Sequence, residues 1–325
     1  MARLTVRRES FPLKGAFRIS RGARTTAEVV VAEIETDGIT GRGECVPYPR
    51  YGETVDGVVA AIEGIAGEAS GLTRDCLSVL LPAGAARNAL DCALWDLEAK
   101  QSGKPVWQLA GLPKPKPLTT AYTLSLDTVE NMAAAAKTSA HMPLLKLKLT
   151  GEGDLDRVRA IRENAPKARL IVDANEAWSI DHLKRYGAAF AELGVELIEQ
   201  PLPAGQDAAL EGMQCPVPIG ADESCHDRHS LSDLKGRYQV INIKLDKTGG
   251  LTEALLLERD ARAMGFEIMV GCMVGTSLAM APATLIAQAA RFVDVDGPLL
   301  MAKDREPGLR YDGATVYPPE SALWG

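Results

Sequence analysis

Hydrophobic and polar residues alternate with a period of two over residues 3–45, which is typical of antiparallel β-strands. The predicted strands are RLTVRRESF, AFRISRG, EVVVAEIETDG and ITGRGEC, and a turn at Asp37-Gly38 is predicted to join the last two. From residue 54 to residue 100 the spacing becomes helical. The clearest predicted helix is ARNALDCALWDLEAKQSGKP, in which Gly103 follows the last apolar repeat. The first part of the chain is therefore expected to be α+β.

A different pattern begins after the proline-rich stretch GLPKPKPL at residues 111–118, where we predict a boundary between two structural units. Short apolar segments now alternate with amphipathic helices. The predicted strands are TAYTLSL, LLKLKLT, LIVDANEAW, ELIEQPL, VPIGADES, VINIKLDKTGG, FEIMVGCMVG and FVDVDG. Polar residues at the strand ends recur every 22 to 26 residues between Lys148 and Lys244. This period predicts a closed (β/α)8 barrel, with a doubly wound open sheet as the alternative.

Composition narrows the class of protein. The chain has 325 residues, of which 46% are hydrophobic and 24% charged, which suits two globular domains. Its net charge of -7 argues against a nucleic-acid partner. No signal peptide or membrane-spanning stretch is recognisable, so a cytoplasmic location without membrane contact is expected. The six cysteines form no Cys-x-x-Cys pair and are expected to be reduced.

Three carboxylates end consecutive predicted strands. Asp173 ends LIVD, Glu199 ends ELIE and Asp222 ends PIGAD. In a barrel these groups would converge at the carboxyl edge of the sheet, where they would repel each other unless a cation lay among them. Oxygen ligands without histidine or thiolate favour Mg²⁺, for which Mn²⁺ could substitute. The alternative is that each is a solvated carboxylate at the start of a loop.

Lysines occupy inward positions on two opposite strands. Alternation in PLLKLKLT directs Lys146 and Lys148 into the barrel, and alternation in INIKLDK does the same for Lys244 and Asp246. The second and sixth strands of eight face each other, so Lys148 and Lys244 would flank a substrate from opposite sides. Two such amines can take an α-proton from one face of a carbon and return a proton to the other. The alternative is that these lysines are structural cations paired with the acids.

Two further conditions belong to that chemistry. A metal ion would have to stabilise the enediolate that forms when the α-proton of a carboxylate leaves. A lysine base must also be neutral, and we expect repulsion between neighbouring lysines and the metal ion to lower the lysine pKa.

The motifs KLK, VDAN, IEQP, GADES and NIKLDKTGG, in this order and spacing, resemble the enolase superfamily and within it the muconate-lactonizing-enzyme subgroup. The resemblance covers the whole chain. It implies an α/β fold: a modified TIM barrel, (β/α)7β, at residues 115–299, and an N-terminal α+β capping domain at residues 1–114 that residues 300–325 complete. It also implies Mg²⁺ on Asp173, Glu199 and Asp222, with Lys148 and Lys244 as the acid/base pair.

The last predicted strand indicates the substrate class. FVDVDG directs Asp294 and Asp296 inward, where two carboxylates need a cation. Dipeptide epimerases of the subgroup carry such an Asp-x-Asp motif, which holds the α-ammonium of a dipeptide. Cycloisomerases and succinylbenzoate synthases, whose substrates lack an ammonium, are not expected to have it. The alternative is an ordinary turn before Gly297.

The capping loops supply further candidates for substrate contact. By resemblance to epimerases that act on L-Ala-D/L-Glu, Arg24 matches an arginine that pairs with the glutamate side chain; a solvated arginine is the alternative. Tyr51 in CVPYPRYGET could close over the barrel, and Lys146 lies beside the proposed base. Ser277 in GCMVGTSLA is predicted to cap a helix and to touch the substrate.

The sequence therefore predicts a Mg²⁺-dependent epimerase that inverts the C-terminal α-carbon of a dipeptide, with L-Ala-D/L-Glu from cell-wall peptide as the expected substrate. A lyase of the same subgroup, either a muconate cycloisomerase or an o-succinylbenzoate synthase, is the enzymatic alternative. A barrel that binds ligands without catalysis is the alternative from another class. A homo-oligomer is expected from the behaviour of related barrels.

Overall fold

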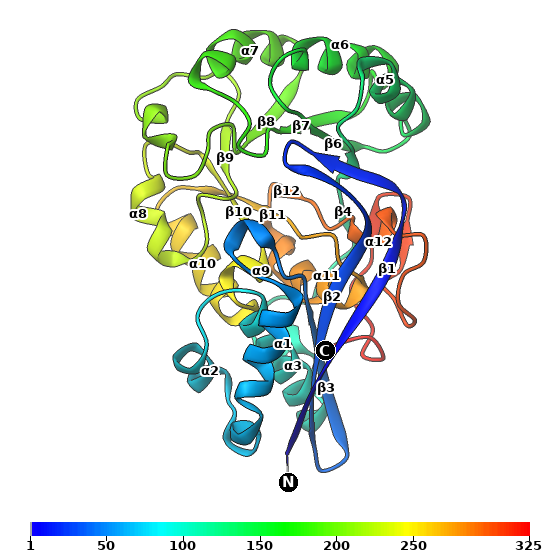
Figure 1. Cartoon of the computed structure of the whole chain (residues 1–325), viewed down its shortest axis with the longest axis vertical. Helices are drawn as coiled ribbons and strands as arrows, with labels where there is room; N and C mark the ends of the chain where they lie inside the picture. The colour runs from blue at the N-terminus through cyan, green and yellow to red at the C-terminus, as the bar shows by residue number, and fades with distance from the viewer. Residues whose placement is uncertain (1) are drawn as a thin grey trace.

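The computed structural model describes residues 2–325 (Figure 1). The N-terminal part contains an antiparallel sheet of β1 (Arg3–Ile19), β2 (Gly22–Thr36) and β3 (Ile39–Cys45). The Asp37-Gly38 turn is confirmed, with both residues at positive φ. The first two predicted strands are one strand, β1, whose pairing with β2 shifts register between Pro12 and Phe17.

Helices cover one face of this sheet. They are α1 (Val55–Gly64), α2 (Arg74–Leu80), α3 (Ala85–Ser102) and α4 (Val106–Leu109), with 3-10 turns at Pro49–Tyr51 and Ala66–Gly71. The predicted helix α3 is confirmed and ends at Gly103, whose φ of 67° gives the left-handed C-cap. Helix α3 packs directly on β3 because Gly41 and Gly43 present no side chain to it.

Gly43 is expected to be indispensable for this packing. A β-carbon built on Gly43 would lie 2.1 Å from the carbonyl oxygen of Ala89 in α3, so helix and strand would have to separate. We expect Gly43→Ala to lower the free energy of unfolding by about 2–4 kcal/mol, as overpacking of a core does. Urea denaturation would measure the change. Gly64→Ala, where a β-carbon meets no atom within 4 Å, is the control and should not destabilise the protein.

The second part of the chain is built on eight parallel strands, and all eight predicted strands are confirmed. In chain order they are β5 (Tyr122–Leu124), β6 (Leu144–Lys148), β7 (Arg169–Asp173), β8 (Val195–Glu199), β9 (Ile219–Ala221), β10 (Val240–Ile243), β11 (Glu267–Val270) and β12 (Phe292–Val293). Each strand pairs with its neighbours in sequence. The ends of the sheet meet, because the Ala121 amide donates to the Val293 carbonyl oxygen at 2.7 Å. The open-sheet alternative is therefore wrong.

Helices follow most of these strands on the outside of the barrel (Figure 1). They are α5 (Val129–Thr138), α6 (Asp154–Asn164), α7 (Ile180–Glu192), α8 (Leu231–Leu234), α9 (Leu245–Thr248), α10 (Leu251–Ala263), α11 (Ser277–Ile286) and α12 (Gly297–Leu300). The predicted alternation of strand and helix is wrong after β8. Only a 3-10 turn, Asp207–Leu210, follows there, because Gly205 and Gly212, both at positive φ, interrupt a helical backbone on either side of it.

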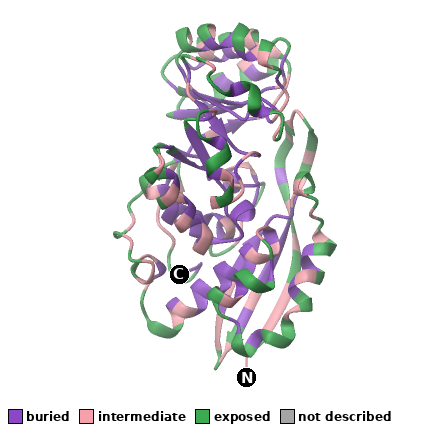
Figure 2. Ribbon diagram, turned by 90° about the vertical axis from the view of Figure 1, so that its left-hand side faces the viewer, coloured by how far each residue is buried: buried purple, intermediate pink, exposed green. Residues whose placement is uncertain are grey.

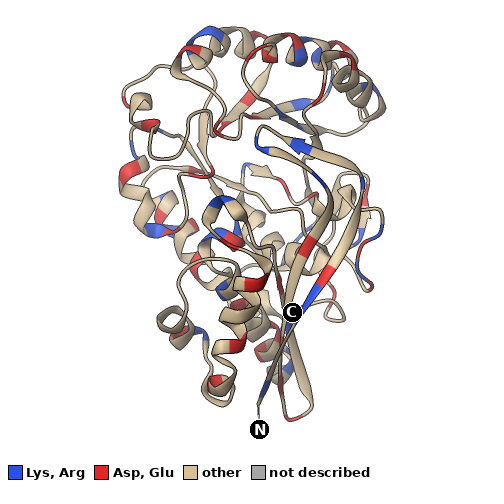
Figure 3. Cartoon of the chain, in the orientation of Figure 1, with Lys and Arg blue, Asp and Glu red and all other residues tan. Residues whose placement is uncertain are grey.

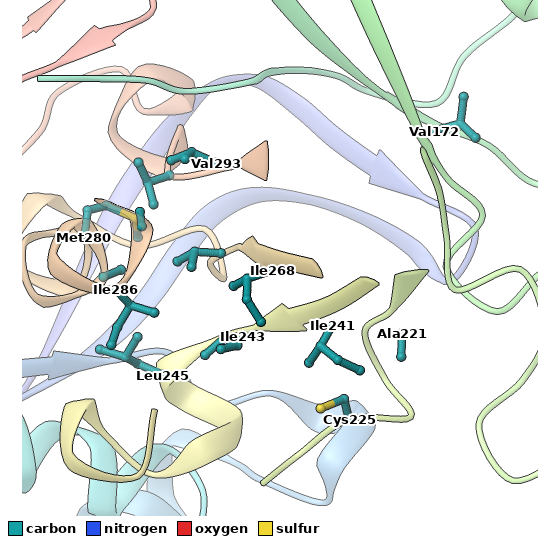
Figure 4. Close-up of a cluster of buried hydrophobic side chains, with 14 of the residues drawn as sticks. Val172, Ala221, Cys225, Ile241, Ile243, Leu245, Ile268, Met280, Ile286 and Val293 are labelled. Carbon is teal, nitrogen blue, oxygen red and sulfur yellow. The ribbon is translucent and has the colours of Figure 1, made fainter. Parts of the chain in front are cut away.

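Alternate strand residues form two separate apolar layers. Outward-facing Ile241, Ile243 and Ile268 belong to one buried apolar cluster with Met280 and Ile286 of α11 (Figure 4). Inward-facing residues form a smaller cluster that fills the barrel interior: Ala121, Leu144, Ile171, Leu197, Val240, Met269 and Phe292. Burial is accordingly concentrated in the strands and inner helix faces (Figure 2). Apolar side chains thus fill the interior of the barrel, and polar side chains gather at the carboxyl ends of its strands.

The end of the chain returns to both parts of the molecule. Residues 311–316 form β13 (Tyr311–Asp312) and β14 (Thr315–Val316), which extend β4 (Leu118–Thr119). The Gly325 amide donates to Asp96 of α3, and the Trp324 indole donates to the Cys92 carbonyl oxygen. Within residues 2–325, no helix is long and apolar enough to cross a membrane. All six cysteines are free.

Candidate active site

The strand register aligns the predicted residues across the barrel mouth. Lys148 of β6 pairs in register with Asp173 of β7, and Asp173 pairs with Glu199 of β8. Asp222 follows the end of β9, and Lys244 follows the end of β10. All five side chains are buried. The prediction that alternation brings these residues to one end of the barrel is therefore confirmed.

The lysines lie on opposite sides of one small cavity. Three strands, β7, β8 and β9, separate β6 from β10, so Lys148 and Lys244 face each other across the barrel. Both line a cavity of about 50 Å³. Lys148 Nζ lies 2.6 Å from Asp173 Oδ2, and Lys244 Nζ lies 2.6 Å from Asp222 Oδ2. Each amine therefore has a carboxylate partner that holds its position.

Two other buried lysines complete the charge network. Lys146 Nζ lies 2.7 Å from both Glu199 Oε2 and Asp294 Oδ2. Lys247 Nζ lies 2.7 Å from Asp222 Oδ1, so Asp222 accepts from lysines on two sides. Acidic and basic positions on the central strands lie close to the turn of the β1–β2 hairpin (Figure 3). The buried lysines and acids therefore form a salt-bridge network at the barrel mouth.

The salt-bridge network raises the pKa of two of the lysines. Burial lowers the pKa of Lys244, and Lys146 repels it, but Asp222 and Glu199 outweigh both effects and the pKa of Lys244 is raised. The pKa of Lys146 is raised in the same way, since Asp294 and Glu199 outweigh burial. Repulsion between neighbouring lysines alone therefore does not lower the pKa of these two lysines.

The surroundings shift the pKa of two of the carboxylates in opposite directions. Burial raises the pKa of Asp173, but the ammonium groups of Lys148 and Lys146 outweigh it and lower the pKa to about 2. Burial and the neighbouring Asp173 raise the pKa of Glu199 to about 7, because Lys146 compensates only in part. The ionised form is therefore favoured at Asp173 and disfavoured at Glu199.

The donor set fits a divalent cation. Within residues 2–325, no three acidic, histidine or cysteine side chains already surround one point, because each acid faces an ammonium; the predicted convergence is not seen in that form. Four buried oxygens at the barrel mouth nevertheless have neither a hydrogen-bond donor nor an ion-pair partner: Asn175 Oδ1, Glu223 Oε2, Asn242 Oδ1 and Asp294 Oδ1. Unpaired acceptors of this kind are costly unless a cation or donor approaches them. All-oxygen donors suit Mg²⁺.

The Asp-x-Asp pair lies at the end of β12, and both side chains are buried. Asp294 is paired with Lys146, whereas Asp296 Oδ2 accepts only the backbone amide of Thr123, at 2.7 Å. Burial and the adjacent Asp294 raise the pKa of Asp296 to about 7. Of the two acids, Asp296 is the one left without a cationic partner.

The capping residues lie above the same cavity. Arg24 and Tyr51 both line it, together with Tyr48. The Arg24 guanidinium lies 5.6 Å from the centre of the Tyr48 ring, which orients it without an ion pair. Tyr51 packs edge-on against His226 with ring centres 4.6 Å apart. The structure thus brings Arg24 and Tyr51 to the site.

Ser277 does not behave as predicted. The helix cap is Thr276, whose side chain accepts from the Leu278 amide. The Ser277 hydroxyl donates to Asp304 and accepts from the Leu309 amide, so it holds the C-terminal segment and does not line the cavity.

Asp246 also turns away from the barrel interior, since the strand ends at Ile243 and α9 begins. Its carboxylate accepts from the Val46 amide, just after β3, at 3.0 Å and from Asn88 of α3 at 2.8 Å. The predicted inward orientation of Asp246 is wrong because alternation does not continue into the helix.

Sequence reasoning missed a salt-bridge cluster that joins the hairpin to the barrel. Arg21, in the β1–β2 turn, lies 2.6 Å from Glu223 and 3.0 Å from Glu176, and Arg50 donates twice to Glu176. Glu176 and its neighbour Asn175 adopt positive φ, which is costly for these residues. The only signal was the position of both glutamates after strand-end acids, in VDANE and GADE.

Comparison with known families identifies both parts of the chain. Residues 1–111 match the N-terminal domain of mandelate racemase / muconate lactonizing enzyme, and residues 128–320 match the enolase C-terminal domain-like family. An L-Ala-D/L-Glu epimerase from Escherichia coli strain K12 is 50% identical over 96% of this chain and 98% of its own. An N-acetyl-D-glutamate racemase from a Pseudoalteromonas species is 48% identical, with coverage of 91% and 94%.

Solved structures show the same similarity. An enolase family member from Agrobacterium tumefaciens, with homology to dipeptide epimerases and with bound sodium and L-Ala-L-Glu, superposes with a TM-score of 0.98 at 55% identity, covering 100% of both chains. A dipeptide epimerase from Enterococcus faecalis, complexed with Mg and L-Leu-L-Tyr, gives 0.91 at 31% identity, covering 98% of this chain and 97% of that one.

Proposed function

The chain belongs to the mandelate racemase / muconate lactonizing enzyme family of the enolase superfamily, and from this membership we propose that it inverts the α-carbon of the C-terminal residue of a dipeptide. Its relatives are epimerases and racemases, and the chain is an isomerase. The observation that carries the proposal is the pair of buried amines, Lys148 and Lys244, on opposite sides of one cavity. The lyase alternative would need only one of them as a base.

The chemistry that the chain supplies is a 1,1-proton transfer. One lysine Nζ, in its neutral form, takes the proton from the α-carbon, and the other, protonated, delivers a proton to the opposite face. The C–H bond that breaks is replaced by a new C–H bond of opposite configuration, so the dipeptide keeps its composition. In the reverse direction the two lysines exchange roles. Asp173 and Asp222, each 2.6 Å from one lysine, orient the amines toward the substrate.

Asp173, Glu199 and Asp222 would hold the divalent cation. Unpaired buried oxygens on the residues next to them, Asn175, Asn242 and Glu223, support a cation at this place. When bound, Mg²⁺ supplies the positive charge that makes the α-proton of a carboxylate acidic enough to remove. Asn242 donates to Glu199 Oε1 at 2.6 Å and fixes that carboxylate. All three acids are buried, which would limit the access of water to the cation.

We propose Ala-Glu as the substrate. Asp296, without a cationic partner, would accept the α-ammonium, and Arg24 would pair with the glutamate side chain. The similarity to an N-acetyl-D-glutamate racemase supports a second candidate, an N-acylglutamate, which shares the glutamate but carries no ammonium. The uncompensated Asp296 favours the dipeptide over the acylated amino acid, because burying an unpaired carboxylate beside an uncharged amide is costly.

We also propose that the two parts of the chain have different roles. Residues 115–299 would be the catalytic barrel, and residues 1–114 with residues 300–325 would form the cap. The contacts of Arg21 with Glu223 and Glu176 support a cap that closes over the barrel mouth.

Deuterium exchange tests the proposed function. The protein would be incubated with Mg²⁺ in D₂O with L-Ala-L-Glu and, separately, with N-acetyl-L-glutamate, and mass and chirality would be followed. Uptake of one deuterium at the glutamate α-carbon with formation of L-Ala-D-Glu is expected. Faster exchange with N-acetyl-L-glutamate would favour the second candidate. A new unsaturated or lactone product without exchange would replace the proposal with a lyase.

Asp296→Asn is expected to weaken binding of the dipeptide. The change removes the carboxylate charge while asparagine can still accept the Thr123 amide, so the fold should persist. A lost hydrogen bond between charged groups corresponds to roughly a 10- to 100-fold rise in KM for L-Ala-L-Glu. The matched control is an N-acetylated Ala-Glu, which has no ammonium and should lose nothing in the variant. If KM rises equally for both peptides, Asp296 does not bind the α-ammonium.

A further inference from the structure

Phe17 separates the candidate active site from a second, larger cavity. It lines both the active-site cavity of about 50 Å³ and a side cavity of about 370 Å³. No other described residue is shared by the two cavities. The centre of the Phe17 ring lies 6.0 Å from Lys148 Nζ. One aromatic ring therefore forms the wall beside the proposed base.

The side cavity is a consequence of the irregular strand β1. The register shift between Pro12 and Phe17 releases residues 13–16 from β2, and these residues form the outer wall of the cavity. Strand β5 and helix α5 form the inner wall. Its lining includes the buried apolar side chains of Leu13, Leu124 and Met132, which form an apolar floor between the two walls. The volume falls in the range of about 300–1,000 Å³ typical of ligand sites.

The order of strands indicates which part of a substrate lies next to Phe17. Strand β5 lies between β12, which is followed by Asp296, and β6, which ends at Lys148. Thr123 of β5 lines the side cavity and donates its amide to Asp296. A dipeptide with its ammonium at Asp296 and its reacting carbon at Lys148 must cross β5. The side chain of its N-terminal residue is then adjacent to Phe17.

We propose that Phe17 determines the size of the N-terminal residue that the site accepts, and that the side cavity is a latent subsite for a large apolar side chain at that position. This inference rests on the proposed dipeptide function. With the ring in place, the active-site cavity ends at Phe17 on the side of β5, so a substrate side chain that points there must be small, like that of alanine. With the ring removed, the two cavities would join, and the apolar floor would receive a leucine side chain.

The test compares wild type, Phe17→Ala and Leu300→Ala on L-Ala-L-Glu and L-Leu-L-Glu. Leu300 lines the side cavity but not the active-site cavity, so its truncation enlarges the cavity and leaves the partition intact. The readouts are α-deuterium uptake and, in the same Mg²⁺ buffer, the Kd of each peptide by calorimetry. In Phe17→Ala, the preference for L-Leu-L-Glu over L-Ala-L-Glu should rise by about tenfold or more, as filling an apolar pocket does. In Leu300→Ala the preference should stay at the wild-type value.

The outcomes separate the two proposals. Wild type that exchanges no dipeptide contradicts the proposed function. Wild type that exchanges L-Ala-L-Glu, together with an unchanged Kd ratio in Phe17→Ala, overturns the role of Phe17 alone. The ring lies near Lys148, so Phe17→Ala could also lose turnover. In that case the ratio of the Kd values for L-Ala-L-Glu and L-Leu-L-Glu decides whether Phe17 determines the preference. An equal gain in Leu300→Ala would also overturn the proposal, since the partition would not be the barrier.

Discussion

Replacing Lys244 with methionine is expected to abolish epimerisation while leaving proton exchange with one diastereomer of the substrate. Methionine keeps the length of the buried side chain but cannot carry a proton, and loss of a general acid or base costs about 10²–10⁴-fold in rate. Lys148, across the cavity, would remain able to remove and return a proton on its own face. In D₂O, the variant should therefore incorporate deuterium into only one of L-Ala-L-Glu and L-Ala-D-Glu, without forming the other.

Lys148→Met is the matched control, because it removes the opposite amine. It should exchange the diastereomer that Lys244→Met does not exchange. Chiral chromatography with mass detection distinguishes the four combinations of variant and peptide. If both variants exchange the same diastereomer, the lysines do not act on opposite faces, and the two-base proposal is wrong. If Lys244→Met still epimerises at the wild-type rate, Lys244 has no role in proton transfer.

Much of this site could be predicted because it depends on local rules. Alternation along a strand decides which side chains face inward, so the inward positions of Lys146 and Lys148 follow from PLLKLKLT. The carboxyl ends of parallel strands meet at one edge, so Asp173, Glu199 and Asp222 were brought to one place. The prediction failed at Asp246, where a strand changed into a helix one residue after Lys244.

Other features depend on contacts between distant segments, which periodicity does not reveal. The pairing of Arg21 with Glu223 joins residues 202 positions apart. The side cavity arises from the register shift in β1. At this point the alternating pattern predicts a break between two strands. Ser277 and Thr276 are both good helix caps, and only the position of Asp304 in the C-terminal segment separates their roles. The expected homo-oligomer stays a prediction.

Glu199→Gln is expected to abolish the response of the protein to Mg²⁺ as well as its activity. Glu199 Oε1 accepts a hydrogen bond from Asn242, whereas Oε2 is only ion-paired with Lys146, at 2.7 Å, so Oε2 is the atom that a cation can approach more readily. Glutamine has the same shape, but one of its two terminal atoms is an amide nitrogen that cannot bind a cation. Loss of residues that only support metal ligands costs 10- to 100-fold, so loss of a ligand should cost more than about 100-fold.

Thermal unfolding separates this effect from a general loss of stability. A ligand that binds only the folded state stabilises it by about 2.7 kcal/mol at 100 times its Kd, so Mg²⁺ should raise the wild-type Tm by several degrees. The Tm of Glu199→Gln should not respond to Mg²⁺. Glu196→Gln, on the same strand but paired with Arg169 at the surface, should respond like wild type. A full Mg²⁺ response in Glu199→Gln would contradict the assignment, because the cation would then lie elsewhere in the barrel.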